Sequence, residues 1–393
     1  MPNDCIYLDH AATTPLHERV LEAMLPHLRN RAASNGLPRG NPSSLHAPGA
    51  AAREAVEEAR ESIARLIGAA PEEIVFTSGG TESDNLAVLG LAAANPDKKH
   101  IVISAVEHPA IRGVGEYLEA TGYEVTRLGV DEDGLVSPER LEDVLRPDTA
   151  LVAVMWANNE VGTVQPIEEL AIICSEANVP FHADAVQAAG HLPIDVSRTP
   201  ISTLALSAHK LYGPQGVGAL YVREGVTLRP ISFGGGQEKG LRGGTENVAG
   251  IVGFGEAARL AYSELEERAR HEESLREALI SGVAALPGVS LNGHRKKRLS
   301  NNVHLCVEGV EAESLVLFLN ALGYAVGSGS ACASSGHKAS PVLLAMGHSE
   351  REAFSAVRIT VGKDSTKAEV SGFLEAFAAA VTRLRELSPL YTS

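Results

Sequence analysis

The sequence predicts an α/β protein in which a mostly parallel sheet is followed by a second, smaller α+β part. Over the first two thirds of the chain, apolar runs of strand length alternate with helical patterns, which is typical of βαβ units. After Gly244 this alternation stops, and a long helical pattern is followed by short strands. With 393 residues, the chain is long enough for two packed domains.

The elements of the first part follow one another in a regular order. Pro48 lies near the start of the first helix and Gly68 at its end, the usual asymmetry of helix ends. The predicted strands cover residues 73–77, 100–106, 151–156 and 180–183. The predicted helices cover residues 50–67, 81–94, 109–121 and 167–177.

The second part begins with a helical pattern over residues 247–285, which is too long for a simple crossover between two strands. We therefore expect this helix to join the two parts. The remaining predicted strands cover residues 289–291, 303–307 and 357–361, and the remaining predicted helices cover 313–322 and 367–387.

Composition narrows the class of protein. Hydrophobic residues make up 44% and charged residues 21% of the chain, as in soluble globular proteins. No apolar run approaches the roughly 18 residues that cross a bilayer, and the N-terminus has no basic, apolar leader, so we expect a cytoplasmic protein without a membrane partner. The net charge of −15 disfavours direct nucleic-acid binding. The four cysteines include no Cys-x-x-Cys pair, so we expect neither a metal site nor a disulfide framework.

Four polar segments directly follow predicted strands, and they are the first candidates for a functional site. Ligands of open α/β sheets bind beyond the carboxyl ends of the strands, so we expect these segments to converge. They are residues 77–81, 107–108, 158–160 and 183–187. The glycines of the first segment would let the backbone approach an anion at the start of a helix, although a tight turn with a helix cap explains them equally well. The chain has neither a P-loop nor a Rossmann glycine motif in the required context.

Three side chains, two of them in these segments and one in the later segment 204–214, suit the chemistry of an aldehyde cofactor. Lys210 follows an apolar run, and a desolvated amine there would be nucleophilic; the alternative is a surface lysine. Asp184 at a strand end would need a cationic partner such as a protonated pyridine nitrogen, unless it caps a helix. His108 would stack on a ring and move protons, unless it is an incidental loop histidine.

Cys332 differs from the other cysteines in its surroundings. It lies in a segment of glycine and serine, the composition of a mobile loop, and a reactive cysteine is normally partly exposed. Cys5, Cys174 and Cys306 lie in or beside apolar elements, so we expect them to be structural. The basic run of residues 294–298 is interpreted as a solvated loop, with a partner-docking patch as the alternative.

Taken together, these segments resemble the cysteine desulfurases of NifS/IscS type, which are class V aminotransferase-like enzymes that use pyridoxal phosphate. The resemblance covers nearly the whole chain, and three short motifs carry it in order. They are residues 207–214 (Ser-Ala-His-Lys-Leu-Tyr-Gly-Pro), 241–247 (Leu-Arg-Gly-Gly-Thr-Glu-Asn) and 327–332 (Gly-Ser-Gly-Ser-Ala-Cys). The segment Tyr7 to Pro15 belongs to the same pattern.

The resemblance implies the type I fold of pyridoxal-phosphate-dependent transferases, with a mostly parallel seven-stranded sheet in the large domain. The large domain would comprise residues 16–260. The small α+β domain would comprise residues 1–15 and 261–393, and it would carry the catalytic cysteine loop at about 327–340. The enzyme would be a homodimer.

The resemblance also assigns residues to the cofactor, the substrate and the reaction. Lys210 would hold pyridoxal phosphate covalently and act on the substrate Cα proton, and His108 would relay protons. Cys332 would take the sulfur of L-cysteine as a persulfide, leaving alanine. Asn159 and Arg358 would bind the substrate. The other cofactor-binding residues would be Gly80, Thr81, Asp184, Gln187, Ser207 and His209, together with Asn159 at the ring hydroxyl and Thr245 from the second subunit.

Two departures bear on the sulfur acceptor, which would be an iron–sulfur scaffold or a tRNA-thiolation enzyme. After the cysteine the chain reads Ala333-Ser-Ser-Gly-His-Lys-Ala-Ser340, where the family often has Leu-Glu-Pro-Ser, and the chain is without the longer C-terminal tail of the IscS-like branch. Three alternatives are a selenocysteine lyase, a true aminotransferase that needs no nucleophilic cysteine, and a non-catalytic scaffold. The presence of Lys210 with all its surroundings disfavours the scaffold.

Overall fold

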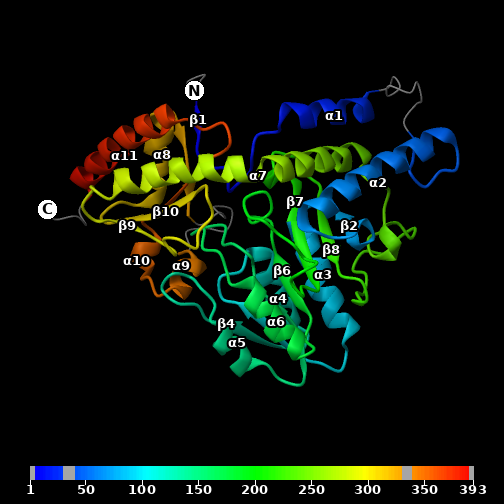
Figure 1. Cartoon of the computed structure of the whole chain (residues 1–393). Helices are drawn as coiled ribbons and strands as arrows, with labels where there is room; N and C mark the ends of the chain where they lie inside the picture. Colours follow the sequence, from blue (N-terminus) through cyan, green and yellow to red (C-terminus); the bar gives the residue numbers. More distant parts are fainter. Residues whose placement is uncertain (1–4, 30–39, 330–338, 389–393) are drawn as a thin grey trace.

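The computed structural model describes residues 5–29, 40–329 and 339–388. A seven-stranded sheet with the order β2-β8-β7-β6-β5-β3-β4 forms the centre of the first part (Figure 1). Strands β7, β6, β5, β3 and β4 are parallel, and β8 is antiparallel to both of its neighbours. The strands are β2 (Ile74–Thr77), β3 (His100–Ser104), β4 (Glu124–Leu128), β5 (Thr149–Ala153), β6 (Phe181–Asp184), β7 (Thr203–Ser207) and β8 (Gly218–Val222).

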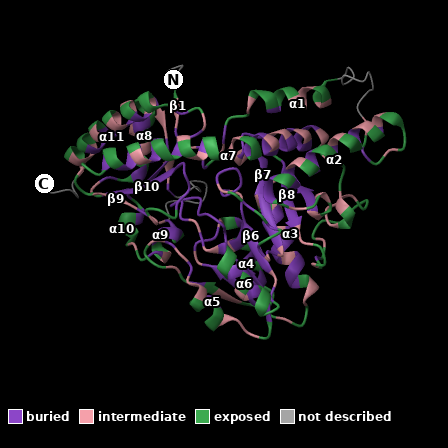
Figure 2. Cartoon of the chain, viewed as in Figure 1, coloured by how far each residue is buried: buried purple, intermediate pink, exposed green. Residues whose placement is uncertain are grey.

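Helices cover both faces of this sheet, because its inner strands are apolar on both sides. In β3, Val102 packs into one hydrophobic core while Ile101 and Ile103 pack into another on the opposite face. Figure 2 shows the central strands as almost entirely buried. The helices of this part are α2 (Ala47–Ile67), α3 (Gly80–Ala94), α4 (Pro109–Ala120), α5 (Pro138–Val144) and α6 (Ile167–Glu176). A short helix, α1 (Glu18–Leu28), precedes them.

The second part is built on a four-stranded antiparallel sheet with the order β12-β13-β10-β9. Its strands are β9 (Val289–Leu291), β10 (Asn302–Val307), β12 (Gly327–Ser328) and β13 (Ala356–Thr360). Its helices are α8 (Ala312–Ala321), α9 (Pro341–Ala345), α10 (Glu350–Ala353) and α11 (Lys367–Leu387). The core of this part includes Phe373 and Phe377, both fully buried. A small parallel pair, β1 (Ile6–Tyr7) with β11 (Tyr324–Ala325), lies beside it.

The long helix α7 (Val248–Val283) connects the two parts, as Figure 1 shows. Its first half packs against α1 and α2, and its second half lies beside β10 and α11. The predicted fold class is therefore confirmed, and β9 and α11 have the predicted bounds. Strand β4 was not predicted because only Leu128 in it is buried, and α1 was missed because Val20 is its one buried residue. None of the described helices is both long and apolar enough to cross a lipid bilayer.

The basic run of residues 294–298 is only partly the solvated loop that we predicted. Lys296 and Lys297 are exposed, but Arg298 is 4% exposed and bridges two segments. Its guanidinium donates to the carbonyls of Val161 (2.7 Å) and Asn292. Burial, with neighbouring guanidinium groups, lowers the pKa of Arg298 to about 9. The prediction of a fully solvated loop was wrong for Arg298, because a run of basic residues does not reveal the buried carbonyl groups that bind one of them.

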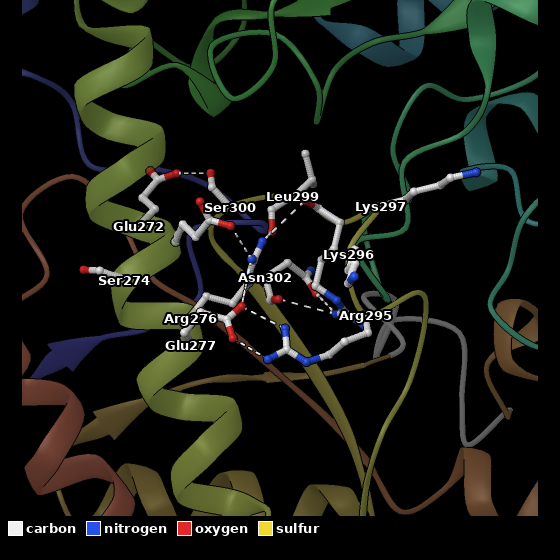
Figure 3. A network of polar contacts seen from close by, with 12 residues as sticks. Glu272, Ser274, Arg276, Glu277, Arg295, Lys296, Lys297, Leu299, Ser300 and Asn302 are labelled. Carbon is white, nitrogen blue, oxygen red and sulfur yellow. Dashed lines mark hydrogen bonds and ion pairs between the residues drawn. The ribbon is translucent and has the colours of Figure 1, made fainter.

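Figure 3 shows the neighbouring polar network, which ties the same run to α7. Arg276 donates to the carbonyl of Leu299 (3.1 Å) and to Glu277 (2.9 Å). Arg295 also binds Glu277, although this pair is half exposed and therefore contributes little. The run thus connects α7 to the loop that follows β5.

Arg298→Met is expected to lower the free energy of unfolding by about 2–4 kcal/mol, because two buried carbonyl groups lose their donor. Urea-induced unfolding followed by circular dichroism would measure the change. Lys296→Met is the matched control in the same run, and it should stay within about 0.5 kcal/mol of the parent chain. Equal effects of the two substitutions would contradict the structural role given to Arg298.

Candidate active site

Lys210 ends the short 3₁₀ helix η2 (Ala208–Lys210), directly after β7. Its ammonium donates to the carbonyls of Ala11 (2.6 Å) and Ala12 (2.7 Å), so the N-terminal segment lies across it. Burial, and then the nearby charge of Arg358, lower the pKa of Lys210 to about 8, although Asp184 and Asp9 oppose the shift. The structure therefore makes this amine far easier to deprotonate than an ordinary lysine.

The N-terminal segment is fixed to the loop after β7 by several hydrogen bonds. The amide and the hydroxyl of Thr14 both donate to the carbonyl of His209 (2.9 Å each), and the amide of Tyr212 donates to the Thr14 hydroxyl (2.8 Å). The Tyr7 hydroxyl donates to the carbonyl of Thr13 (3.0 Å). Sequence reasoning noted this segment as a motif but gave it no role, because carbonyl acceptors leave no mark in the side-chain pattern.

Asp184 and Gln187 lie beside Lys210. Gln187 donates its side-chain amide to the carbonyl of Ala11 (2.9 Å), the same oxygen that Lys210 binds. The Asp184 carboxylate accepts from the amide of Val186 (2.9 Å). Burial raises the pKa of Asp184, although His108 and Lys210 oppose the shift. A buried carboxylate of this kind suits a cationic partner, such as a protonated pyridine nitrogen.

Two further buried carboxyl groups surround Asp184, and sequence reasoning gave them no role. Glu107 accepts from the amide of Met155 (2.7 Å), and burial raises its pKa to about 8, so it keeps its proton at neutral pH. Asp84 on α3 lies 3.2 Å from the ring of His182. Burial, with Asp184 and Glu107 nearby, raises the pKa of Asp84 as well. Of these three carboxyl groups near the carboxyl end of β6, Asp184 is therefore the one best placed to carry a negative charge, because the Lys210 ammonium lies near it.

His108 is the N-cap of α4, and its Nδ1 accepts from the amide of Ala110 (3.2 Å). Burial lowers the pKa of His108, and the charges of Lys210 and Arg112 act in the same direction, whereas Asp184 opposes them. The ring is therefore neutral at pH 7. An imidazole that accepts at Nδ1 carries its remaining proton at Nε2, which leaves that atom for proton exchange with a ligand.

The glycine segment after β2 forms a cradle at the start of α3, a helix of 15 residues. A Cβ atom on Gly80 would lie 2.7 Å from Val186, and one on Gly218 would lie 2.6 Å from Gly79. Ser207 at the end of β7 is buried, and Thr81 in the first turn of α3 is exposed. These donors and the free N–H groups of the helix suit a phosphate group.

His209 and Thr245 were also predicted to bind this phosphate. Nδ1 of His209 lies 3.1 Å from the Thr13 hydroxyl, and burial, with Lys210 beside it, lowers the pKa of His209 to about 4. A neutral ring offers a hydrogen bond and no positive charge. Thr245 is exposed, and its approach from a second subunit stays a prediction.

Arg358 lies in the middle of β13 and is buried. It donates to the Asp9 carboxylate (2.8 Å) and to the backbone carbonyl of Asn159 (2.8 Å). Its buried Nε has no partner among the described residues. A Cβ atom on Gly327 would come within 3.1 Å of this guanidinium, so a glycine there keeps space in front of it. Asn159 therefore contacts Arg358 through its backbone, and the predicted substrate-binding role of both residues stays a proposal.

Cys332 lies outside the described residues, and so does most of the predicted cysteine loop. Cys174 and Cys306 are poor candidates for its role. Burial raises the pKa of the Cys174 thiol to about 12 and also raises the pKa of Cys306. Cys5 is exposed, so the expectation that it is structural was wrong; it precedes β1 and contributes to no core.

Several of these observations fit pyridoxal phosphate. Lys210 offers an amine for its aldehyde, Asp184 offers a buried anion for its pyridine nitrogen, and the cradle at Gly80 offers donors for its phosphate. Strand β7, before Lys210, is adjacent to β6, which ends at Asp184, and one strand, β8, separates β7 from β2, which precedes Gly80. The residues present therefore suit this cofactor in charge and in hydrogen bonding.

The chain is similar to known proteins over nearly its whole length. Residues 6–373 match the family model described as aminotransferase class-V. The chain is 46% identical over 389 residues to a cysteine desulfurase IscS of Methanosarcina thermophila, covering 99% of this chain and 95% of the relative. It is also 46% identical over 390 residues to a cysteine desulfurase IscS of Neisseria meningitidis serogroup C, covering 98% and 94%.

Solved structures give the same result. A structure described as a NifS-like protein superposes with a TM-score of 0.89 at 37% identity, covering 96% of this chain and 100% of that one. A structure described as SspA in complex with cysteine superposes with a TM-score of 0.79 at 37% identity, covering 92% and 100%. The chain therefore belongs to the class-V aminotransferase family, and within it to the cysteine desulfurases of NifS and IscS type.

Proposed function

We propose that this protein is a pyridoxal-phosphate-dependent cysteine desulfurase, which converts L-cysteine to L-alanine and leaves the sulfur as a persulfide on Cys332. The observation that carries the proposal is the pairing of an easily deprotonated amine with a buried carboxylate in one site. Lys210 and Asp184 are both near the N-terminal segment, and each influences the pKa of the other. The similarity to cysteine desulfurases over nearly the whole chain selects the substrate.

Each residue of the site has one task in this proposal. Lys210 holds the cofactor and exchanges the substrate Cα proton, while Asp184 keeps the pyridine nitrogen protonated. Gln187 and Asn159 bond the ring hydroxyl. The phosphate is held by Gly80, Thr81, Ser207 and His209 of one subunit and by Thr245 of the other. When bound, pyridoxal phosphate is an electron sink that lets bonds at the substrate's α and β carbons break.

The remaining tasks concern the substrate and its sulfur. Arg358 binds the carboxylate of L-cysteine, and its Nε, which has no partner in the described part of the chain, offers a donor for it. His108 moves a proton through Nε2. The Cys332 thiolate attacks the substrate sulfur, so that an S–S bond forms as the C–S bond breaks, and the carbon fragment takes up protons to become alanine. A thiol acceptor then takes the outer sulfur from the persulfide.

We further propose that the enzyme acts as a homodimer in the cytoplasm. Leu45 is 96% and Phe233 is 85% exposed, and large apolar side chains are rarely that exposed unless a partner covers them. Their neighbours Ser43 and Gly235 line the same cleft of about 400 Å³, which places the two segments together. An iron–sulfur scaffold protein or a tRNA-thiolation enzyme would accept the sulfur.

The proposal is tested with purified protein, pyridoxal phosphate and L-cysteine in the presence of a thiol reductant. Equimolar alanine and sulfide are expected. Turnover of selenocysteine with refusal of L-cysteine would favour the selenocysteine lyase alternative, and alanine formation without sulfide would contradict desulfuration.

The rate at which the cofactor-free protein takes up pyridoxal phosphate should follow the fraction of Lys210 that is deprotonated at each pH. Only the neutral amine attacks the aldehyde, so below a pKa of about 8 the rate should rise roughly tenfold per pH unit. Well above pH 8 it should level off, because nearly all of the amine is then neutral. The visible absorption of the attached cofactor measures the rate between pH 6.5 and 10. Hexylamine in the same buffers is the control, and a protein profile that keeps rising to pH 10 as hexylamine's does would contradict the lowered pKa.

A further inference from the structure

Glu160 and Ser340 form a buried contact outside the groups that bind cofactor and substrate. The hydroxyl of Ser340 donates to the Glu160 carboxylate (2.5 Å). Ser340 is 1% exposed and Glu160 is 8% exposed, so water competes little for either group. A hydrogen bond in such dry surroundings is strong, and its loss leaves a buried polar group unsatisfied.

Glu160 stands on a rigid part of the active site. The side chain of Asn158 accepts from the amides of Glu160 and Val161 (2.9 Å each) and donates to the carbonyl of Val106 (2.9 Å). Asn302 donates to the carbonyl of Glu160 (3.0 Å). The backbone of Glu160 is therefore held in a fixed place beside Asn159, its neighbour in the sequence.

Two cations approach Glu160 from other elements. Arg358 of β13 and Arg112 of α4 both favour its charged form, as does the bond from Ser340, whereas burial raises its pKa to about 7. The buried Nε of Arg112 has no partner among the described residues, so this guanidinium stays available to balance the carboxylate. Glu160 thus forms a polar junction between the active-site loop, β13 and the segment that begins at Ser340.

Ser340 in turn fixes the start of α9. Its hydroxyl accepts from the amide of Leu343 (3.2 Å) as the N-cap, and Leu343 is fully buried. The other described end of the cysteine segment is fixed as well, since Gly329 donates its amide to the carbonyl of Ala356 (3.2 Å). Of these two ends, only the one at Ser340 depends on a single side-chain contact with the active-site loop.

We propose that Glu160 is a positioning residue for sulfur transfer: by binding Ser340, it fixes the downstream end of the chain segment that carries Cys332 relative to the site of Lys210. The inference rests on the proposed function, because it concerns the step in which the thiolate meets the substrate sulfur. A reacting group displaced by about 1 Å loses on the order of a hundredfold in rate. The binding of cofactor and substrate uses other residues and should not change.

The test separates these two stages in the holoenzyme. The absorption change of the bound cofactor on mixing with L-cysteine reports the first stage, and mass spectrometry of quenched samples reports the persulfide on Cys332. Glu160→Ala should leave the first rate within about twofold and slow persulfide formation at least tenfold. Glu160→Gln keeps a hydrogen-bonding group at the same place and should recover most of the rate. Because both residues act through one contact, Glu160→Ala and Ser340→Ala combined should slow the step no more than either alone.

The chain offers a matched control in a second buried carboxylate–serine pair, in which Ser300 donates to Glu272 on α7 (2.6 Å), as Figure 3 shows. Ser300→Ala should lower stability about as much as Ser340→Ala yet leave persulfide formation within about twofold. If Glu160→Ala does not fold, the comparison of Ser340→Ala with Ser300→Ala carries the test.

Three results would overturn the inference. These are persulfide formation at the parent rate in Glu160→Ala or Ser340→Ala, equal slowing in Ser300→Ala, and equal loss of both stages. A parent enzyme that forms no persulfide on Cys332 would instead overturn the proposed function, and the inference with it.

Discussion

Replacing Cys332 by alanine is expected to abolish sulfide release from L-cysteine, with a loss of about a thousandfold or more. The reason is that the proposed reaction needs a thiolate to accept the substrate sulfur, and no water molecule or carboxylate substitutes for it. The buried thiols of Cys174 and Cys306 are poor replacements, since burial raises the pKa of both. The thiolate, and not the thiol, is the nucleophile.

The variant should still bind pyridoxal phosphate, because the residues proposed to hold the cofactor are untouched. Its visible absorption should therefore match that of the parent protein and should still respond to L-cysteine. Cys5→Ala, at the exposed cysteine, is the control and should keep full sulfide release. Sulfide release by Cys332→Ala at even a tenth of the parent rate would refute the mechanism. In a true aminotransferase, Cys332→Ala would leave turnover intact, because transamination needs no nucleophilic cysteine. The experiment therefore also separates the two enzyme classes.

Replacing Lys210 by alanine should remove both the covalent hold on the cofactor and all measurable turnover. The amine of Lys210 binds the carbonyls of Ala11 and Ala12 and lies near Asp184. Among the described residues, no other lysine makes these contacts. Without it the cofactor would be held only by the proposed contacts to its phosphate and ring, and the substrate Cα proton would lose its proposed base. We expect a fall of about a thousandfold or more in turnover.

Borohydride reduction followed by peptide mass mapping measures the covalent hold directly. The parent protein should carry the cofactor on Lys210, and Lys210→Ala should lose it on dialysis. Lys297→Ala, at an exposed lysine, is the control and should behave as the parent does. Cofactor fixed to a different lysine in the parent protein would show that the site has been wrongly assigned.

Most of the fold could be predicted from the sequence because its elements are strongly patterned. The buried strands β3 and β5 are built on continuous apolar runs, and the buried residues of α11 recur every three or four positions, as in an amphipathic helix. Elements with little burial, such as β4 and α1, carry almost no such pattern and were missed. A recognisable pattern of apolar residues appears in a sequence only where the element is buried on one or both faces.

The candidate site divides in the same way. The sequence by itself determined the chemistry: a lysine after an apolar run, an aspartate after another, a glycine cradle, and a cysteine among small residues. Each residue type suits its proposed task, but each also had a structural alternative when taken alone, and only the three motifs in order favoured the functional interpretation. The residues far apart in the chain could be assigned to one site because strands of a parallel sheet end at one edge.

Only the tertiary structure decided which neutral groups complete the site and how charged groups are buried. The carbonyls of Ala11 and Ala12, the contact of Glu160 with Ser340, and the burial of Arg298 all join segments distant in sequence. Every residue has a carbonyl, and glutamate, serine and arginine are common on surfaces, so nothing in their identity marks these roles. The free energy of each of these contacts depends on how far its polar groups are removed from water and on hydrogen-bond partners within about 3 Å. Both conditions arise only when the chain has folded.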